Sequence, residues 1–280
     1  MSGGSDIRTG FTTKTLESLI LDDALSFDEL CRRGAEIGFD FVEIRDFDGN
    51  LDAETGRRFA DQAMAAGLHP MLAWDGESVL SGAGEETWFD HIEMAARFPK
   101  PRYCRVTLAP GLVVAGGYGR ADFDRLRERL RPVLETAVSR GVGLALENSF
   151  ERLWVGDESS SVGFAEAVEQ LPSCRVCFDP TNLVVNAGES PAEARAAVTG
   201  FLDHYEDRIA YIHLKSSIAG TLRPELVDDA DIPPTTVVSA MQTGARLCME
   251  LPNQPSLHSA MARLAKANAI VETLRRGGSN

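Results

Sequence analysis

The sequence predicts a (β/α)8 barrel, a closed ring of eight parallel strands in which a helix follows each strand. Short apolar runs alternate with longer amphipathic segments about eight times along 280 residues, a unit length that is ordinary for this fold. No linker or change of composition divides the chain, so we expect a single domain over residues 1–280, with the barrel between about residues 10 and 275. An open doubly wound sheet is the alternative, but no G-x-G-x-x-G pattern follows the first strand.

The eight strands are predicted from short runs rich in apolar residues. These runs cover residues 10–16, 39–47, 68–74, 102–110, 142–150, 174–182, 209–217 and 245–253. Strands that alternate with helices pair in parallel, joined by right-handed crossovers. The carboxyl ends of all eight strands should therefore meet at one end of the barrel, where barrel enzymes carry their active sites.

The helices are predicted from amphipathic patterns between these runs. They cover residues 27–37, 53–66, 87–97, 121–140, 161–171, 191–206, 234–243 and 256–276. Ser26 and Gly38 bound the first of them, and Ser190 followed by Pro191 is a typical helix start. The longest irregular stretch, residues 216–234, follows the seventh strand. Loops of that length are uncommon unless they cover a site.

Charge and composition argue against several classes of protein. Lys and Arg number 28 and Asp and Glu 42, so the net charge is −14. Such a field opposes non-specific binding to nucleic acid or to anionic membranes. The first residues show no basic-then-apolar signal segment, and no run of 18 apolar residues occurs. We therefore expect a cytoplasmic protein with neither nucleic-acid nor membrane partners, and a homo-oligomer stays open.

The cysteines do not form a disulfide or zinc pattern. There are five, an odd number, scattered through predicted core segments: Cys31, Cys104, Cys174, Cys177 and Cys248. Cys174 and Cys177 form a C-x-x-C pair within one predicted strand. Because side chains three apart on a strand point to opposite faces, this pair should bind no metal.

Four consecutive strands end in residues that ligate metals. The fifth ends at Glu147, the sixth at Asp179, the seventh at His213 and the eighth at Glu250, with one strand–helix unit between successive members. Carboxylates crowded at one height would repel one another unless a cation holds them. Three carboxylates and one imidazole suit Mn²⁺, which we prefer, or Mg²⁺ or Co²⁺, better than a thiolate-type zinc site.

Side-chain alternation supports this hypothesis. If Glu147 points into the barrel, so does Ala145; likewise Cys177 shares a face with Asp179, and Cys248 with Glu250. Small residues would then lie below the polar ones, while large apolar residues face the helices. Any one of these acids alone would more often be a strand-end cap or a salt-bridge partner. It is their matched height that favours a metal.

The chain resembles the xylose isomerase-like barrels of sugar isomerases and epimerases, which include ketose 3-epimerases and inosose dehydratases. The segments that carry the resemblance are "LALENSFE", "VCFDPTN", "YIHLKS" and "CMELP". The resemblance implies that the four residues named above bind one divalent cation that polarises a substrate oxygen. It also implies that Glu147 and Glu250 form an acid–base pair, which exchanges a proton next to a carbonyl while the metal stabilises the enediolate.

Two positions depart from the epimerase pattern. Many epimerases carry a His three residues after the sixth-strand Asp, where this chain has Asn182. They also carry an Arg six residues after the seventh-strand His, where this chain has Ala219; Arg223 lies four residues further on. Both family residues contact or orient substrate. Both departures concern the reaction and leave the four predicted metal ligands in place.

Further residues are candidates for the mouth of the barrel. Those assigned to substrate binding are Lys215, Asn182, Glu151, Trp74 and Arg45. Each has an ordinary structural alternative: a salt bridge for Lys215, an ion pair for Arg45 and its neighbour Glu43, a solvated loop charge for Glu151, and core or lid packing for Trp74. His69 starts its strand and should lie at the wrong end of the barrel. The remaining histidines in helical patterns are expected at the surface: His91, His204 and His258.

The function predicted is a metal-dependent isomerase or epimerase of a keto-sugar or keto-polyol. The alternative enzyme is a dehydratase of a cyclic polyol or keto acid, because loss of a β-hydroxyl can follow the same proton abstraction. An endonuclease of the same fold is disfavoured by the negative charge and by Asn182. A non-catalytic barrel is disfavoured because it would have no reason to keep four converging ligands.

Overall fold

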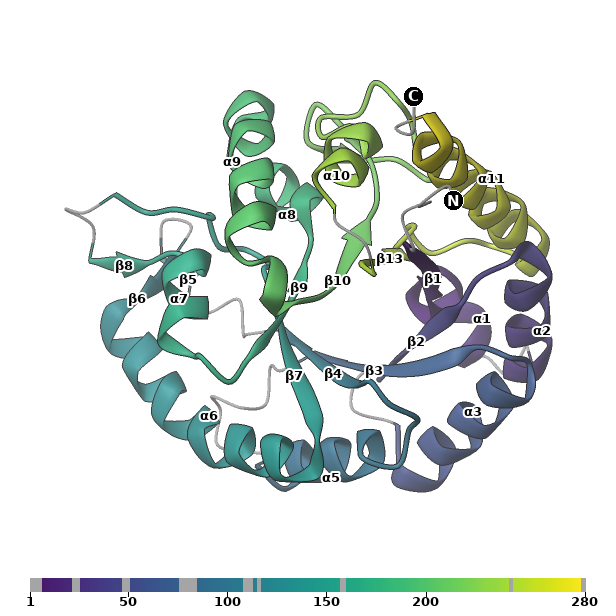
Figure 1. Ribbon diagram of the computed structural model, residues 1–280, viewed down its shortest axis with the longest axis horizontal. Helices are drawn as coiled ribbons and strands as arrows, with labels where there is room; N and C mark the ends of the chain where they lie inside the picture. Colours follow the sequence, from purple (N-terminus) through teal and green to yellow (C-terminus); the bar gives the residue numbers. More distant parts are fainter. Residues whose placement is uncertain are drawn as a thin grey trace, which may run out of the picture.

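The computed structural model describes residues 7–21, 26–46, 51–75, 85–107, 113–114, 117–156, 160–241 and 244–277. Eight parallel strands close into a barrel, in the order β1-β13-β10-β9-β7-β4-β3-β2 around the ring (Figure 1). They are β1 (Arg8–Thr12), β2 (Phe41–Arg45), β3 (His69–Asp75), β4 (Arg102–Thr107), β7 (Val142–Glu147), β9 (Arg175–Phe178), β10 (Ile209–Leu214) and β13 (Arg246–Met249). The predicted fold is confirmed.

Helices surround the ring, and each interval between successive barrel strands contains at least one (Figure 1). They are α1 (Glu17–Leu21), α2 (Phe27–Ile37), α3 (Ala53–Ala65), α5 (Glu85–Ala95), α6 (Arg120–Arg140), α7 (Phe164–Gln170), α8 (Pro180–Val185), α9 (Pro191–His204), α10 (Pro234–Ala240) and α11 (Leu257–Gly277), with short 3-10 turns η1 (Thr13–Leu16) and η3 (Glu206–Arg208). Within the described ranges, none combines the length and apolar character that crossing a membrane requires.

The helix boundaries follow the predicted capping residues closely. Gly38 ends α2 with a positive φ of 95°, a conformation that glycine adopts without a steric penalty. Ser190 and Glu193 form a reciprocal capping box at the start of α9, where Pro191 occupies the first turn. Ser26 stands at the start of α2, but its side chain makes no capping hydrogen bond.

Several strands end earlier than the apolar runs suggested. The sixth run was expected to continue to residue 182, but β9 ends at Phe178 and α8 begins at Pro180. The turn forms because Asp179 caps α8: its carboxylate accepts a hydrogen bond from the backbone N–H of Asn182. Likewise the first run becomes the 3-10 turn η1 directly after Thr12. Both changes place polar residues at the mouth of the barrel.

Apolar side chains form two separate clusters. The larger lies between the strands and the surrounding helices, and the smaller fills the inside of the barrel. The inner cluster comprises Phe41, Met71, Ala145, Cys177, Ala210, Tyr211 and Cys248. The inward direction expected for Ala145, Cys177 and Cys248 is thereby confirmed.

Aromatic rings also fill part of the barrel, beside the small residues that were expected below the site. The ring of Phe41 lies directly against Gly10, where an added Cβ would be 2.4 Å from a ring carbon. A glycine on β1 thus makes room for an aromatic side chain from β2. Tyr211 contributes a second ring to the same space.

The long segment after β10 is ordered around one carboxylate. It contains a two-stranded hairpin, β11 (Ser217–Ile218) and β12 (Thr221–Leu222). The carboxylate of Asp231 accepts hydrogen bonds from the Ser217 hydroxyl and from the backbone N–H groups of Ala219 and Gly220. Three donors of this kind hold the carboxylate ionised, and the pKa of Asp231 is lowered although burial opposes this. A second small sheet, formed by β5 (Val113–Val114), β6 (Gly117–Gly119) and β8 (Ser161–Val162), lies outside the barrel ring.

Candidate metal centre

The four predicted ligands converge at the carboxyl ends of their strands. Glu147 is the last residue of β7, Asp179 follows β9, His213 lies on β10 and Glu250 follows β13. Each offers one nitrogen or oxygen atom, and these four atoms lie within 4.8 Å of one another. The side chains are buried. Neighbouring barrel strands thus bring together residues that are far apart in the chain.

His213 is the hub of this group, which we call the acid–histidine cluster. Its Nδ1 lies 2.8 Å from Glu147 Oε1, 3.4 Å from Glu250 Oε2 and 4.0 Å from Asp179 Oδ2. A single imidazole nitrogen therefore faces three carboxylates. Carboxylates that share a proton or a cation can lie side by side, whereas carboxylates that share neither would repel one another.

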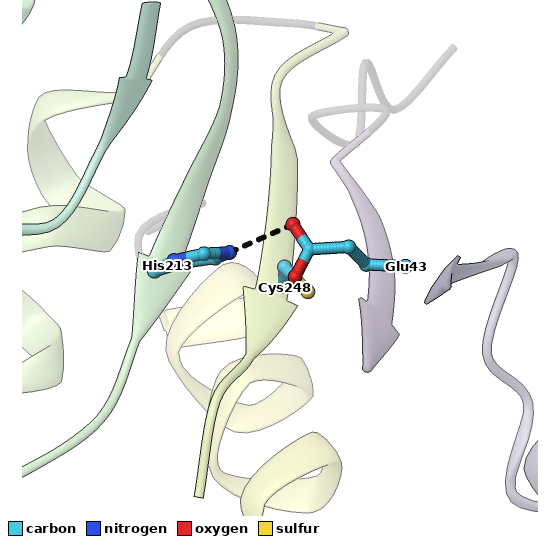
Figure 2. Close-up of side chains that lie close together, drawn as sticks. All are labelled: Glu43, His213 and Cys248. Atoms are coloured by element: carbon cyan, nitrogen blue, oxygen red, sulfur yellow. Dashed lines mark hydrogen bonds and ion pairs between the residues drawn. The ribbon is translucent and has the colours of Figure 1, made fainter. Parts of the chain in front are cut away.

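The other nitrogen of His213 faces Glu43, deeper in the barrel. Nε2 lies 3.0 Å from Glu43 Oε2, and the two side chains point toward one another across the barrel (Figure 2). The Tyr211 hydroxyl donates to the same carboxylate oxygen at 2.5 Å. A carboxylate on the far nitrogen fixes the ring and its tautomer, as in many histidine metal sites. Glu43 therefore orients Nδ1 toward the three acids.

Cysteine sulfur lies close enough to form alternative ligand sets. Cys248 groups with Glu43 and His213, and Cys177 groups with Glu147 and His213 (Figure 2 shows the first set). Burial raises the pKa of the Cys177 thiol to about 12 and that of Cys248 still further. A thiol must lose its proton to ligate a metal. The oxygen-rich set is therefore the one the site favours.

Four basic side chains balance the acids. Lys215 Nζ lies 2.6 Å from Asp179 Oδ2 and 2.9 Å from Glu250 Oε2. Lys14 Nζ and Arg45 Nη1 lie 2.8 and 3.7 Å from Glu250 Oε1. On the other side of the cluster, Arg105 Nη1 lies 2.7 Å from Glu147 Oε2.

These contacts keep both glutamates ionised. Burial alone would raise the pKa of Glu147, but Arg105 and His213 outweigh it and lower the pKa to about 2. The pKa of Glu250 is held well below its ordinary value because Lys14 and Lys215 outweigh burial in the same way. Burial would lower the pKa of His213, yet the surrounding acids raise it well above its ordinary value. Each glutamate is thus ionised, with its charge held by the neighbouring cations.

Asp179 behaves differently. Burial, together with the nearby glutamates, raises its pKa to about 6 despite the ammonium group of Lys215. Its Oδ1 accepts the capping hydrogen bond of α8, while its buried Oδ2 faces the interior of the cluster. An oxygen aimed in this way is suited to a cation. The donor set of three carboxylates and one imidazole fits a hard or borderline dication such as Mn²⁺.

Two of the five residues predicted to bind substrate lie at this cluster. Lys215 bridges Asp179 and Glu250, and Arg45 approaches Glu250. Ion pairs, the structural alternative for both, are therefore present. A bridging lysine lies within reach of anything that binds beside these acids.

The other three face elsewhere. The amide of Asn182 donates to the backbone carbonyl of Asn148, and its oxygen accepts from Asn186. Glu151 is buried and not a solvated charge: its Oε2 accepts from two backbone N–H groups of its own loop, and burial raises its pKa. Trp74 lies in the outer cluster, stacked on His91, so it does not support the predicted contact with a sugar.

The remaining histidines are away from the cluster. His69 starts β3 at the opposite end and contacts the carbonyl of Pro101, as expected. His204 and His258 are exposed. The expectation that His91 is a surface residue is wrong: it is 3% exposed and its Nε2 lies 2.9 Å from Asp46 Oδ2. The helical pattern did not predict this burial, because it depends on the packing of α5 against Trp74.

Sequence reasoning missed two cations of the cluster. Arg105 on β4 pairs in register with Ala145, whose side chain faces into the barrel, so strand alternation carried a signal for it. Lys14 follows the first strand within η1, and the spacing of the acids contained no signal for it. Lone basic residues after a strand are too common to single out.

Comparisons with known proteins agree with the fold. A family model described as "Xylose isomerase-like TIM barrel" matches residues 31–275. A search of curated proteins found no match. Among solved structures, a D-psicose 3-epimerase from Clostridium cellulolyticum H10 is 12% identical, with a TM-score of 0.69 over 96% of this chain and 99% of that one.

Two further solved structures are similar over nearly their whole length. A xylose isomerase domain protein from Planctomyces limnophilus is 16% identical, with a TM-score of 0.66 over 99% of both chains. An L-ribulose 3-epimerase is also 16% identical, with a TM-score of 0.67 over 97% of both chains. At such identities the likeness concerns the fold.

Proposed function

The chain belongs to the xylose isomerase-like TIM barrel family, and from this premise we propose that it is a divalent-metal-dependent isomerase or epimerase. Its substrate is a keto-sugar or keto-polyol, and its reaction is the transfer of a proton at a carbon next to a carbonyl. The observation that carries the proposal is the convergence of Glu147, Asp179, His213 and Glu250 on one point. The names of the epimerases that share the fold add support.

The proposed ligands of the dication are these four residues, with Mn²⁺ preferred over Mg²⁺ or Co²⁺. Asp179 presents Oδ2 because its other oxygen caps α8, and His213 presents Nδ1 because Glu43 holds Nε2. When bound, the ion supplies positive charge that stabilises the oxygen anion formed as the carbon loses its proton.

Glu147 and Glu250 are the proposed acid–base pair. Both are ionised, and they approach His213 from β7 and from the end of β13. In an epimerisation, one carboxylate removes the proton, and the other, once it has taken up a proton from solvent, returns that proton to the opposite face of the same carbon. Lys215 lies against Glu250 and Asp179 and can donate a hydrogen bond to a substrate oxygen that displaces one of these acids.

Exchange of substrate hydrogen with solvent tests the proposal across many candidate sugars at once. The Mn²⁺-loaded protein is incubated in D₂O with a panel of ketoses and inososes, and NMR follows deuterium uptake next to the carbonyl. Glu147→Gln and Glu250→Gln should each lower the exchange rate by roughly 10²–10⁴-fold, the range for loss of a general base. Thr273→Val, at an exposed position of α11, is a control that should keep full activity.

The panel also separates the two enzyme classes. Epimerisation leaves the absorbance of the solution unchanged, whereas loss of a β-hydroxyl produces an enone that absorbs in the ultraviolet. An enone would identify a dehydratase on the same site. Absence of bound Mn²⁺ in metal analysis, with no thermal stabilisation when Mn²⁺ is added, would refute the metal-dependent function.

A further inference from the structure

Around the acid–histidine cluster and the adjoining Glu43, basic residues are as numerous as carboxylates. The carboxylates are Glu43, Glu147, Asp179 and Glu250, and the basic residues in contact with them are Lys14, Arg45, Arg105 and Lys215. Among the described residues, four basic side chains thus face four carboxylates, with the imidazole of His213 between the acids, before any metal binds. A dication brings two positive charges into a site that already has its cations, and burial makes the excess costly.

The basic residues are not spread evenly around the ring. Lys14 follows β1, Arg45 ends β2, and both reach Glu250 Oε1 at 2.8 and 3.7 Å. In the ring β13 is next to β1, which is next to β2. The pair therefore forms a basic edge on one side of Glu250, while Asp179, Glu147 and His213 lie on the other.

This basic edge is open to the mouth of the barrel. The Lys14 side chain is 35% exposed and that of Arg45 is 15% exposed, whereas the Glu250 side chain is only 5% exposed. A ligand that enters from solvent thus meets the two cations before it meets the acids. Both contact one oxygen, Oε1, of a carboxylate whose other oxygen lies 3.4 Å from His213 Nδ1 and faces the proposed metal position.

We propose that Lys14 and Arg45 bind an anionic group of the substrate, a carboxylate or a phosphate ester, on the β1–β2 edge beside the metal. This inference rests on the proposed function and narrows its substrate to acidic or phosphorylated keto-sugars. Once Glu250 shares its charge with the metal, the two cations lose part of the negative charge that Glu250 offers them, and an anionic group beside them replaces it. A guanidinium and an ammonium group can together satisfy several oxygens of such a group.

Anion binding to the Mn²⁺-loaded protein tests the inference by calorimetry. The probes are inorganic phosphate and glycolate, which separate a phosphate site from a carboxylate site, with neutral dihydroxyacetone for comparison. At least one anion should bind the wild type more tightly than dihydroxyacetone does. Lys14→Met and Arg45→Met should each weaken that anion by about tenfold, the loss expected for one charge-assisted hydrogen bond, and leave dihydroxyacetone unaffected. Affinity should also fall as salt is added.

Lys266→Met is the matched control. Lys266 also forms one ion pair with a glutamate, Glu225, but on the exposed surface, and its loss should leave anion affinity unchanged. If the wild type, Lys14→Met and Arg45→Met bound the anion with equal affinity, the anion would be held only by the metal, and the inference would be overturned. So would failure of both anions to bind. Failure of Mn²⁺ itself to bind would instead count against the proposed function.

Discussion

Substitution of Lys215 by methionine should tighten metal binding while it destabilises the metal-free protein. The ammonium group of Lys215 occupies the space between Asp179 Oδ2, at 2.6 Å, and Glu250 Oε2, at 2.9 Å. These oxygens are two of those predicted to hold the cation. Lys215 is thus a tethered cation in competition with a free one, and methionine keeps most of its length and apolar stem without the charge.

The size of both effects follows from the burial of the pair. Removal of one partner of a buried ion pair costs about 3–5 kcal/mol, because the other charge is left unpaired. Metal-free Lys215→Met should therefore unfold more easily by roughly that amount. A hydrogen bond to a charged group is worth about 1.5–3 kcal/mol, and each ~1.4 kcal/mol corresponds to tenfold in affinity. A metal that no longer displaces the ammonium group should bind about 10- to 100-fold more tightly.

Two measurements check this reasoning. Chemical denaturation with and without excess Mn²⁺ should show a destabilised metal-free variant that Mn²⁺ restores, and calorimetric titration with Mn²⁺ should show the higher affinity. Lys266→Met is the control: its ion pair has the same N–O distance of 2.6 Å but lies on the surface. Exposed pairs contribute little, so both quantities should stay close to those of the wild type.

If Lys215→Met bound Mn²⁺ as weakly as the wild type or more weakly, the ammonium group would be an aid to the metal site and not a competitor. If the metal-free variant were as stable as the wild type, the acids would be held by something other than this lysine.

Three further predictions concern the surroundings of the site. Gly10→Ala should lower the free energy of unfolding by about 1–3 kcal/mol, because the new methyl group would overlap a ring inside the barrel; denaturation will show it, with Gly200→Ala as a helical control that meets no atom within 4 Å. Glu43→Gln should weaken Mn²⁺ binding by about 10- to 100-fold, since it removes the carboxylate that orients His213; unchanged affinity in a titration would exclude this role. Asp231, whose pKa is lowered, holds the segment after β10 through three hydrogen bonds, so this segment should resist proteases at neutral pH. It should lose that resistance as pH falls below the ordinary carboxyl pKa and the carboxylate takes up a proton. In Asp231→Asn the segment should be cleaved readily at every pH.

The strand-end residues were predictable because the barrel is a regular repeat. Parallel strands of similar length bring residues one strand–helix unit apart to the same height. That rule alone placed Glu147, Asp179, His213 and Glu250 together, and the structure brings them within 4.8 Å. Capping residues such as Gly38 and Ser190 could be predicted equally well, because their effect on the backbone is local.

Residues whose direction depends on tertiary packing were not predictable in the same way. Alternation along β3 predicts that Trp74 and Ala73 lie on opposite faces of the strand, but it does not predict which face points into the barrel. Packing decided it, and Trp74 stacks against His91 beneath α5. Asn182 was expected at the site because it occupies the position at which many of the epimerases that the chain resembles carry a substrate-contacting His, yet the turn into α8 directs its amide to Asn148.

The fold and the common height of the four strand-end residues could thus be predicted from the sequence, because both depend on a short repeating pattern. Only the tertiary structure decided the charge balance of the site. Lys14 meets Glu250 across 236 positions, and Arg105 meets Glu147 across a strand pair. Ion pairs between distant residues depend on ring closure and on side-chain reach, and no local pattern encodes either.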